Sequence, residues 1–309
     1  MILIVCLNLA VDQIVHVRNL RVGEVHRSIA TWRQAGSKGV NVARVLKVLD
    51  APCLLAGFLG GEKGKFIGES LEKDGIDYDP SPIAEESRTC FILHDEASHR
   101  QTVINEPGPR IQLMEYERFV VQFRTWLEKI DSVVISGSLP PGLPEETYAQ
   151  LITWARDAGK QTLLDCSGDS LQPAVEAKPH LLKVNHLEAA ALLNEPVESP
   201  ERGLQMIDRL IRLGPSVVMI TFGGHGAVLA SAGKRCRLTP PQIRAKNSVG
   251  SGDAAMAGLA AELGRGHSLE QAGILAMAAG AANALHGGGH CTAEEIAAMK
   301  KQVICELIA

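Results

Sequence analysis

The fold of this chain is decided by the stretch Asn247-Ser248-Val249-Gly250-Ser251-Gly252-Asp253-Ala254-Ala255-Met256-Ala257-Gly258. Gly250 and Gly252 allow the backbone to turn with positive φ, and the residues after Asp253 favour a helix. A glycine turn that opens a helix gathers unpaired N–H groups at one point, where the helix dipole adds about half a positive charge. This point suits a phosphate, and Asp253 beside it is placed to accept a proton from a hydroxyl group.

Two other interpretations of this stretch start from the same residues. An Asp in the first turn of a helix is common, because the helix dipole stabilises its charge. The run Gly250-x-Gly252-x-x-Ala255 also fits a loose dinucleotide-binding fingerprint. That fingerprint requires a second strand and an acidic residue that close a βαβ unit. Here Gly264-Arg265-Gly266 leads into another helical stretch, which excludes it.

The composition is that of a globular α/β protein. The chain has 309 residues, a net charge of −4 with both signs mixed, and 7 cysteines. A small negative net charge of mixed signs does not indicate nucleic-acid binding. Scattered cysteines without a C-x-x-C pair are typical of cytosolic proteins, in which thiols stay reduced. The apolar residues 1–7 lack the marks of a signal peptide and predict a buried strand, while the apolar residues 274–285 are too few to span a bilayer. We therefore expect a cytoplasmic protein without a nucleic-acid or membrane partner.

A second glycine turn precedes another predicted helix, in Ala35-Gly36-Ser37-Lys38-Gly39-Val40-Asn41-Val42-Ala43-Arg44-Val45-Leu46. Lys38 lies inside the turn, where a cation would meet an anionic ligand. No Walker A sequence is present, since the nearest look-alike, Gly64-Lys65-Phe66, lacks the Ser or Thr that ligates magnesium. Asp12, at the end of the first predicted strand, is either a ligand for substrate hydroxyls or a turn residue.

Residues 13–33 and 88–106 follow a different pattern from the rest of the chain. Short stretches of alternating apolar and polar residues predict strands, and residues 88–94 and 101–105 read as a hairpin. These strands fall outside the helical rhythm of the neighbouring segments. They predict a small sheet set on the main body.

The remaining chain alternates between predicted strands and helices. Strands are expected at 53–58, 133–138, 161–165, 181–185 and 217–222, helices at 66–73, 145–158 and 187–193, and a turn at 79–82. This alternation predicts a mostly parallel sheet covered by helices on both faces, with the functional loops gathered at one edge.

His286-x-x-x-His290-Cys291 has a spacing that a metal site could use. The three glycines between the histidines make this segment a loop, and no partner pair stands elsewhere in the sequence. We therefore favour a glycine loop shaped around a nucleotide over a zinc site.

Together these motifs resemble those of the ribokinase-like (PfkB) sugar kinases, and most closely their branch of 1-phosphofructokinases and tagatose-6-phosphate kinases. The resemblance runs along nearly the whole chain. It rests on residues 35–44 and 249–253, with Ser136-Gly137-Ser138-Leu139-Pro140-Pro141-Gly142 between them. It implies one ribokinase-like domain over residues 1–309, a three-layer α/β/α fold with a mostly parallel central sheet, and a β-sheet lid formed by about 13–33 and 88–106.

The resemblance also implies ATP-dependent phosphorylation of a hexose phosphate, with Mg²⁺ and, as a further candidate, a monovalent cation such as K⁺. Asp253 would be the base, and the amides around Gly250, Ser251 and Gly252 would form the anion hole. The nucleotide and its metal would be held by Lys183, Asn185, Thr221, Gly223, Gly226 and Asn283, with Glu188 holding magnesium through water. The sugar site would be lined by Asp12, Arg27, Gly36, Ser37, Lys38, Asn41, Arg88 and Ser138.

Within this resemblance, the cations Arg27, Lys38 and Arg88 predict a substrate that already carries a phosphate. A neutral sugar or nucleoside would not need them, so a kinase for such substrates is the alternative on the same fold. A catalytically silent sugar-phosphate sensor is a second alternative, against which Asp253 and Glu188 weigh. The lid would form the contact of a homodimer.

Two residues depart from the family pattern. Ser37 stands where the family usually has a second glycine, and Val184 replaces the proline of a K-P-N run. The first change predicts a less close approach of the backbone to the sugar, and the second a looser turn at Lys183.

Overall fold

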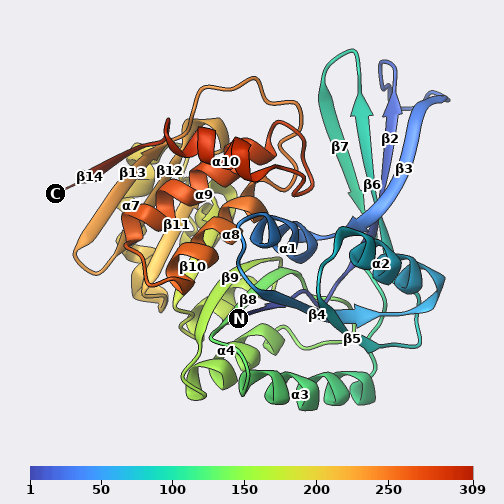
Figure 1. Ribbon diagram of the computed structural model, residues 1–309, viewed down its shortest axis with the longest axis horizontal. Coiled ribbons are helices and arrows are strands. Elements are labelled where there is room, and N and C mark those ends of the chain that lie inside the picture. Colours follow the sequence, from blue (N-terminus) through green and yellow to red (C-terminus); the bar gives the residue numbers. More distant parts are fainter. Residues whose placement is uncertain (309) are drawn as a thin grey trace.

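The computed structural model describes residues 1–308 and contains two β-sheets (Figure 1). The larger sheet has ten strands in the order β14-β13-β12-β11-β10-β9-β8-β1-β4-β5. Neighbours from β11 to β5 pair in parallel, and β12, β13 and β14 extend the sheet in antiparallel fashion. The expected mostly parallel sheet is confirmed. Its strands are β1 (Ile2–Val5), β4 (Cys53–Leu59), β5 (Tyr78–Pro82), β8 (Ser132–Ser138), β9 (Gln161–Ser167), β10 (Leu181–Asn185), β11 (Val217–Thr221), β12 (Ala227–Ser231), β13 (Lys234–Thr239) and β14 (Ile304–Ile308).

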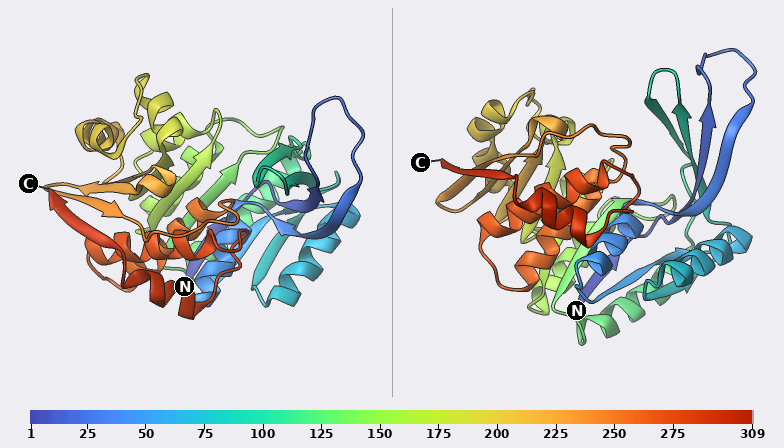
Figure 2. Two further views of the ribbon diagram at one scale, coloured as in Figure 1. Left: turned by 90° about the horizontal axis from the view of Figure 1, so that it is seen from above. Right: turned by 45° about the horizontal axis from the view of Figure 1, so that its top comes forward.

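Helices cover both faces of this sheet, so the molecule has the expected three layers (Figure 2). Because successive side chains of a strand point to opposite faces, the buried strand β1 sends Ile2 and Ile4 into one core and Leu3 and Val5 into the other. The first core is closed by α1 (Lys38–Val48), α2 (Gly61–Asp74), α8 (Ser251–Gly264), α9 (Leu269–Asn283) and α10 (Ala293–Lys300). The second is closed by α3 (Leu113–Leu127), α4 (Thr147–Asp157), α5 (Leu171–Glu176), α6 (His186–Leu193) and α7 (Pro200–Leu213).

The smaller sheet has four strands in the order β3-β2-β6-β7 and stands away from the main body (Figure 1). We call it the lid. It is mixed, since β2 and β6 run parallel and the outer pairs run antiparallel. Its strands lie close to the ranges expected from the sequence: β2 (Ala10–Val17), β3 (Ser28–Gly36), β6 (Arg88–Asp95) and β7 (Arg100–Asn105).

The turn expected at 79–82 is wrong, because these residues belong to the edge strand β5. Leu55 to Leu59 of β4 pair in parallel with Tyr78 to Pro82. The proline residues of this stretch led to the prediction of a turn. An edge strand tolerates proline, because the N–H groups on its outer side need no partner in the sheet. The strands β12, β13 and β14 had no counterpart in the sequence prediction.

The helix pair α8 and α9 holds the glycine turn of the opening motif in place. A side chain at Gly258 would lie 2.8 Å from the backbone of Ala276, so the two helices approach at van der Waals distance through small residues. Asp253, in the first turn of α8, is thereby fixed by a helix that is buried from Asp253 to Glu262, at the strand-end edge of the sheet.

Candidate active site

Two cavities open at the carboxyl ends of the parallel strands, on either side of the first turn of α8. The larger, of about 660 Å³, reaches from the body to the lid strands and is called the lid cavity. The smaller, of about 260 Å³, lies against α8 and α9 and is called the helix cavity. Asp253 lines the lid cavity, whereas Ser251 and Gly252 line the helix cavity. The glycine turn therefore lies where the contents of the two cavities would meet.

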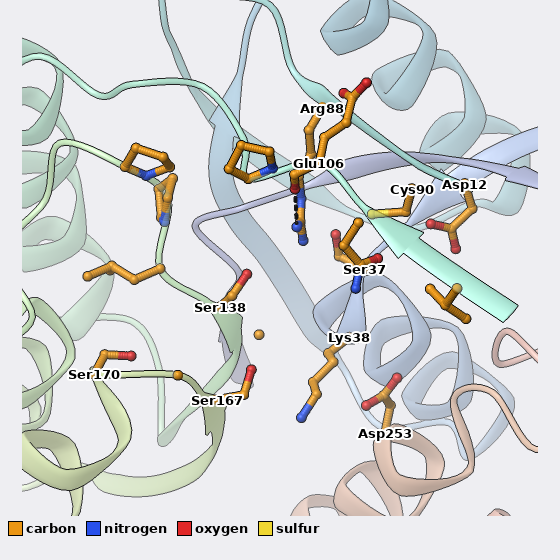
Figure 3. A pocket seen from close by; sticks show the side chains of 18 of the residues that line it. Asp12, Ser37, Lys38, Arg88, Cys90, Glu106, Ser138, Ser167, Ser170 and Asp253 are labelled. Atoms are coloured by element: carbon orange, nitrogen blue, oxygen red, sulfur yellow. Dashed lines mark hydrogen bonds between the residues drawn. The ribbon is translucent and has the colours of Figure 1, made fainter. Parts of the chain in front are cut away.

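Asp253 is a buried carboxylate that points toward the lid cavity (Figure 3). It follows Gly250, which has a φ of 82° at the start of α8. Its Oδ2 accepts a hydrogen bond of 2.8 Å from Asn41 Nδ2. Burial, and then the negative charge of Asp165, raise the pKa of Asp253. A raised pKa makes this carboxylate a stronger base than an exposed aspartate.

A cluster of charges lies next to Asp253. Asp165, at the end of β9, is completely buried and accepts hydrogen bonds from Lys38 Nζ at 2.7 Å and Lys183 Nζ at 2.6 Å. Burial works to raise the pKa of Asp165, but the two lysines outweigh it and lower that pKa. Burial likewise opposes the charge of Lys38, but Asp165, Asp253 and Glu188 raise its pKa. Lys38 and Lys183 therefore share one buried carboxylate partner beside the glycine turn.

This geometry bears on the role expected for Lys38 in binding the phosphate of the substrate, which stays a prediction. The lysine does have an anionic partner within the protein, Asp165, so it does not need a substrate phosphate to offset its burial. Its ammonium group lies among Asp165, Asp253 and Glu188, at the base of the lid cavity. Asp165 itself was missed in the sequence, although an Asp at the end of a buried strand is the same signal that singled out Asp12.

The start of α6 is organised by a capping box. Asn185 Oδ1 accepts hydrogen bonds from the backbone N–H groups of Leu187 and Glu188, both at 2.9 Å. Glu188 Oε2 accepts one from the backbone of Asn185, and its Oε1 lies 3.9 Å from Lys38 Nζ. Asn185 thus positions α6 with its amide oxygen, while Glu188 keeps one carboxylate oxygen directed toward the charge cluster.

Asp12 lines the lid cavity, and Gly36, which does not line it, packs against the Asp12 carboxyl group. A side chain at Gly36 would lie 2.0 Å from the Asp12 carboxyl, so only glycine leaves room for it. Burial raises the pKa of Asp12 to about 6, against the lowering effect of Arg44 and Arg88. A largely desolvated carboxylate of this kind is suited to accept hydrogen bonds from hydroxyl groups.

Ser37 occupies a backbone conformation that glycine normally takes. Its φ is 102° and its ψ is 158°, in a region that is costly by about 1–3 kcal/mol for other residues. The serine therefore takes a backbone conformation that glycine adopts more easily. Its Oγ donates a hydrogen bond of 3.0 Å to the backbone oxygen of Asn8.

The structure separates the sugar-site candidates into two groups. Asp12, Ser37, Lys38, Asn41, Arg88 and Ser138 all line the lid cavity. Arg27 does not, because it precedes β3 whereas the cavity lies near the other end of that strand, a span of about 30 Å for nine residues. Arg27 is exposed at the far end of the lid, and its side chain is too far from the lid cavity of the same chain to contact a ligand there.

The nucleotide-site candidates also separate. Thr221, Gly223 and Gly226 line the helix cavity together with small and apolar residues such as Ala281 and Met277. Asn283 is completely buried and does not line it. Its Nδ2 donates to Val249 O at 3.0 Å, and its Oδ1 accepts from Gly289 N at 2.8 Å. Asn283 therefore ties two loops together behind the glycine turn.

The glycine loop at 287–289 packs behind the same turn and does not line the helix cavity, and its expected place around a nucleotide stays a prediction. Gly288 N donates to Val249 O at 3.0 Å. His286 pairs with Glu295, and His290 with Gln34. Within residues 1–308, no cluster of three or more His, Cys, Asp or Glu side chains could hold a metal ion. No helix in this part of the chain is long and apolar enough to cross a membrane.

The chain matches the family model described as pfkB family carbohydrate kinase over residues 1–295. It therefore belongs to this family, and it is an ATP-dependent sugar kinase.

Three solved structures illustrate the likeness. Phosphofructokinase-2 from Escherichia coli, in complex with substrates and products, has 25% sequence identity and a TM-score of 0.90, covering 97% of this chain and 98% of that one. A protein from Staphylococcus aureus, described provisionally as a phosphofructokinase, has 29% identity and a TM-score of 0.82, covering 100% and 99%. A protein from Thermotoga maritima, described as a possible 1-phosphofructokinase, has 24% identity and a TM-score of 0.90, covering 100% and 99%, which supports the fold alone.

Proposed function

We propose that this kinase transfers the terminal phosphoryl group of ATP to a hydroxyl group of a hexose phosphate, as 1-phosphofructokinases and tagatose-6-phosphate kinases do. The observation that carries the proposal is the position of the first turn of α8 between the two cavities, with Asp253 on the lid side and Gly252 on the helix side. A sugar in the lid cavity and a nucleotide in the helix cavity would bring hydroxyl and phosphate together at this turn.

In this arrangement Asp253 accepts the proton of the attacking hydroxyl, which its raised pKa favours. The backbone N–H groups of Gly250 and Gly252, at the start of a helix, would donate to the transferring group, whereas the N–H group of Ser251 already donates to Ser248 O at 3.1 Å. Lys183 Nζ would touch a side chain placed at Gly252, at 2.9 Å, so its charge lies directly beside these amides. Lys38 and Lys183, held by Asp165, offset the charge of the transferring phosphoryl group.

Glu188, at the start of α6, would hold a divalent cation together with the phosphates of ATP. Glu188 directs one carboxylate oxygen toward the charge cluster, and Mg²⁺ prefers such oxygen ligands with several waters retained. When bound with ATP, the ion would neutralise charge on the phosphates. We include K⁺ as a candidate because a further structure of the Escherichia coli enzyme is described as a complex with potassium.

The phosphate that the substrate already carries is assigned to Arg88. Its Nε and Nη1 donate to the backbone oxygens of Asn8 and Glu106 at 3.1 and 3.0 Å, which orients the guanidinium group on the wall of the lid cavity. Within residues 1–308 its Nη2 makes no hydrogen bond. A phosphate would be a strong acceptor for such a group.

We also propose that two copies associate through the lid. The lid protrudes from the body (Figure 1) and exposes apolar side chains that do not line the lid cavity, among them Ile29, Trp32 and Ile104. Association would cover this surface, and one structure of the Escherichia coli enzyme is described as a tetrameric inhibited form. Light scattering should give at least a dimer, and charged replacements of Trp32 and Ile104 together should yield monomers. A wild-type monomer would refute this part of the proposal.

The substrate class is tested by ADP release with ATP and Mg²⁺ over a panel of sugars. Fructose 1-phosphate, fructose 6-phosphate and tagatose 6-phosphate are the first candidates, against free fructose, ribose and adenosine. We expect at least one hexose phosphate to be preferred over every neutral compound in kcat/KM. A preference for a neutral sugar or nucleoside would favour the alternative kinase, and binding without turnover would favour a sensor.

A further inference from the structure

Asn8 lies beneath the lid cavity, in the turn that joins β1 to β2, and contacts four of the segments that build this cavity. Only 2% of its surface is exposed. Its side-chain Nδ2 donates to Pro107 O at 3.0 Å and to Ser138 Oγ at 3.2 Å. Its backbone oxygen accepts from Ser37 Oγ at 3.0 Å and from Arg88 Nε at 3.1 Å. Asn8 does not itself line the cavity.

The orientation of the Asn8 amide is set by its neighbours. The backbone oxygen of Pro107 can only accept, so the nitrogen of the amide must face it. The opposite atom, Oδ1, is buried without a hydrogen-bond partner in residues 1–308. A side chain at Gly108 would lie 2.2 Å from this oxygen, and Gly108 has a φ of 105°. The fold thus keeps a buried amide in one orientation although its oxygen is unpaired in residues 1–308, which is unfavourable for folding.

Asn8 determines what two serines offer to a ligand, Ser138 through the orientation of its amide and Ser37 through its backbone oxygen. A hydroxyl group has one hydrogen to donate and two lone pairs. Ser138 Oγ accepts from Asn8, so its hydrogen is free to point into the lid cavity. Ser37 Oγ donates its hydrogen to Asn8, so only lone pairs remain for a ligand. The two serines therefore present opposite polarity, a donor at Ser138 and an acceptor at Ser37.

We infer that Asn8 is a positioning residue that sets this polarity and thereby matches the cavity to a sugar phosphate in one direction. The Ser138 hydroxyl, together with the Arg88 guanidinium group that Asn8 also holds, donates to the phosphate. The Ser37 hydroxyl, next to Asp12, accepts from hydroxyl groups of the sugar. This inference rests on the proposed hexose-phosphate substrate and adds a residue that acts on it through others.

The test is a double-mutant cycle of Asn8→Ala and Ser138→Ala, read as KM for the preferred sugar phosphate, KM for ATP and kcat. Asn8→Ala should raise KM for the sugar phosphate about tenfold, as expected for one misdirected hydrogen bond, with KM for ATP and kcat changed less than about twofold. With Ser138→Ala already present, Asn8→Ala should change KM less than about twofold. Calorimetric titration with the sugar phosphate in the absence of ATP should give the same pattern.

A variant that replaces the hydrogen-bond donor of Asn8 by an acceptor makes the test stricter. Asn8→Asp places an acceptor where the donor was, so Ser138 would turn its hydrogen inward, and KM for the sugar phosphate should rise more than in Asn8→Ala. Equal KM effects of Asn8→Ala in both backgrounds, or an Asp variant no worse than the Ala variant, would overturn the inference. Asn8→Ser takes the place of the alanine variant in the cycle if that variant does not fold, as judged by circular dichroism.

The proposed substrate class and the proposed role of Asn8 can be disproved independently of each other. If the wild-type enzyme phosphorylates only neutral sugars, the proposed substrate class is wrong, and the anionic ligand of Ser138 is wrong with it. If the wild-type enzyme prefers a hexose phosphate but the cycle is additive, only the role of Asn8 is wrong.

Discussion

The lid cavity and the helix cavity share the first turn of α8 but are built from different kinds of residue. The lid cavity is lined by charged and polar side chains that come from separate elements, among them Asp12, Lys38, Arg88 and Asp253. The helix cavity is lined largely by glycine, alanine and proline, with few functional side chains. Recognition on the lid side thus depends on individual side-chain groups, and on the helix side on backbone and shape. Removing groups should damage the first cavity, and adding bulk should damage the second.

The largest effect is expected at Asp253, the side chain on which the proposed chemistry depends. Asp253→Asn removes the base, so kcat should fall by at least the ~100-fold typical of general-base loss. Neither KM for ATP nor the melting temperature should change much, and both can be measured on the same preparation. A folded variant with kcat near that of the wild type would exclude Asp253 as the base.

The next effect is expected at Arg88, on the far side of the same cavity. Arg88→Met should raise KM for the sugar phosphate by about 10- to 150-fold, the equivalent of a charge-assisted hydrogen bond of about 1.5–3 kcal/mol. KM for the corresponding free sugar should hardly move, which makes the free sugar the control. Equal losses for both sugars would indicate that Arg88 supports the wall and does not bind phosphate.

A substitution at Lys38 tests whether the base of the lid cavity affects kcat, whereas its far side, at Arg88, affects KM. Because it is held by Asp165 beside Asp253, Lys38→Met should lower kcat by about tenfold or more, through lost stabilisation of the transferring group. KM for the sugar phosphate should rise less than in Arg88→Met. The opposite result, a large change in KM with kcat unaffected, would support the role in substrate-phosphate binding first expected for Lys38.

Bulk rather than charge should matter in the helix cavity. Ala281→Leu adds three carbon atoms to its wall and should raise KM for ATP by about tenfold, since inserting such a group into a shaped site costs on the order of 1–3 kcal/mol. KM for the sugar phosphate is the control and should stay within about twofold. Ala281→Gly should leave both values near those of the wild type. An unchanged KM for ATP in Ala281→Leu would mean that the nucleotide does not occupy this cavity.

The smallest effect concerns pH. The pKa of Asp12 is about 6, so kcat/KM for the sugar phosphate should fall about fourfold between pH 7.5 and 5.5 as this carboxylate gains a proton. Asp12→Asn should lower kcat/KM at pH 7.5 and remove this part of the acid limb. The remaining slope in the variant measures the titration of the substrate phosphate and of Asp253.

The same group gives a stability prediction with a defined sign. Because burial raises the pKa of Asp12 above its ordinary 3.8, the folded state binds a proton more readily than the unfolded chain, and stability falls as pH rises from about 4 to 6. Asp12→Asn should therefore raise the free energy of unfolding at pH 7.5 by up to about 3 kcal/mol. The gain should disappear near pH 4, which denaturant titrations at both pH values would reveal.

The sequence by itself determined the features that depend on neighbouring residues. The glycine turn at 250–252, the helix that follows it and the alternation of strands with helices are local patterns, and they led to the correct fold and to most of the lid cavity. For Ser37, the sequence revealed only part of what the structure shows. Its replacement of a glycine was visible, but only the structure shows that it takes a conformation that glycine adopts more easily, because that φ is imposed by the surrounding fold.

Tertiary structure alone decided which charges meet. Lys38 and Asp165 lie 127 positions apart, and nothing local to either residue indicates that they pair across two strand ends. The same holds for Asn8 and Ser138, which are 130 positions apart. Arg27 is the opposite case: it belongs to the lid by sequence, but the length of β3 carries it away from the cavity of its own chain. Local patterns specify backbone conformation, whereas charge pairing depends on distances in space that only the assembled sheet defines.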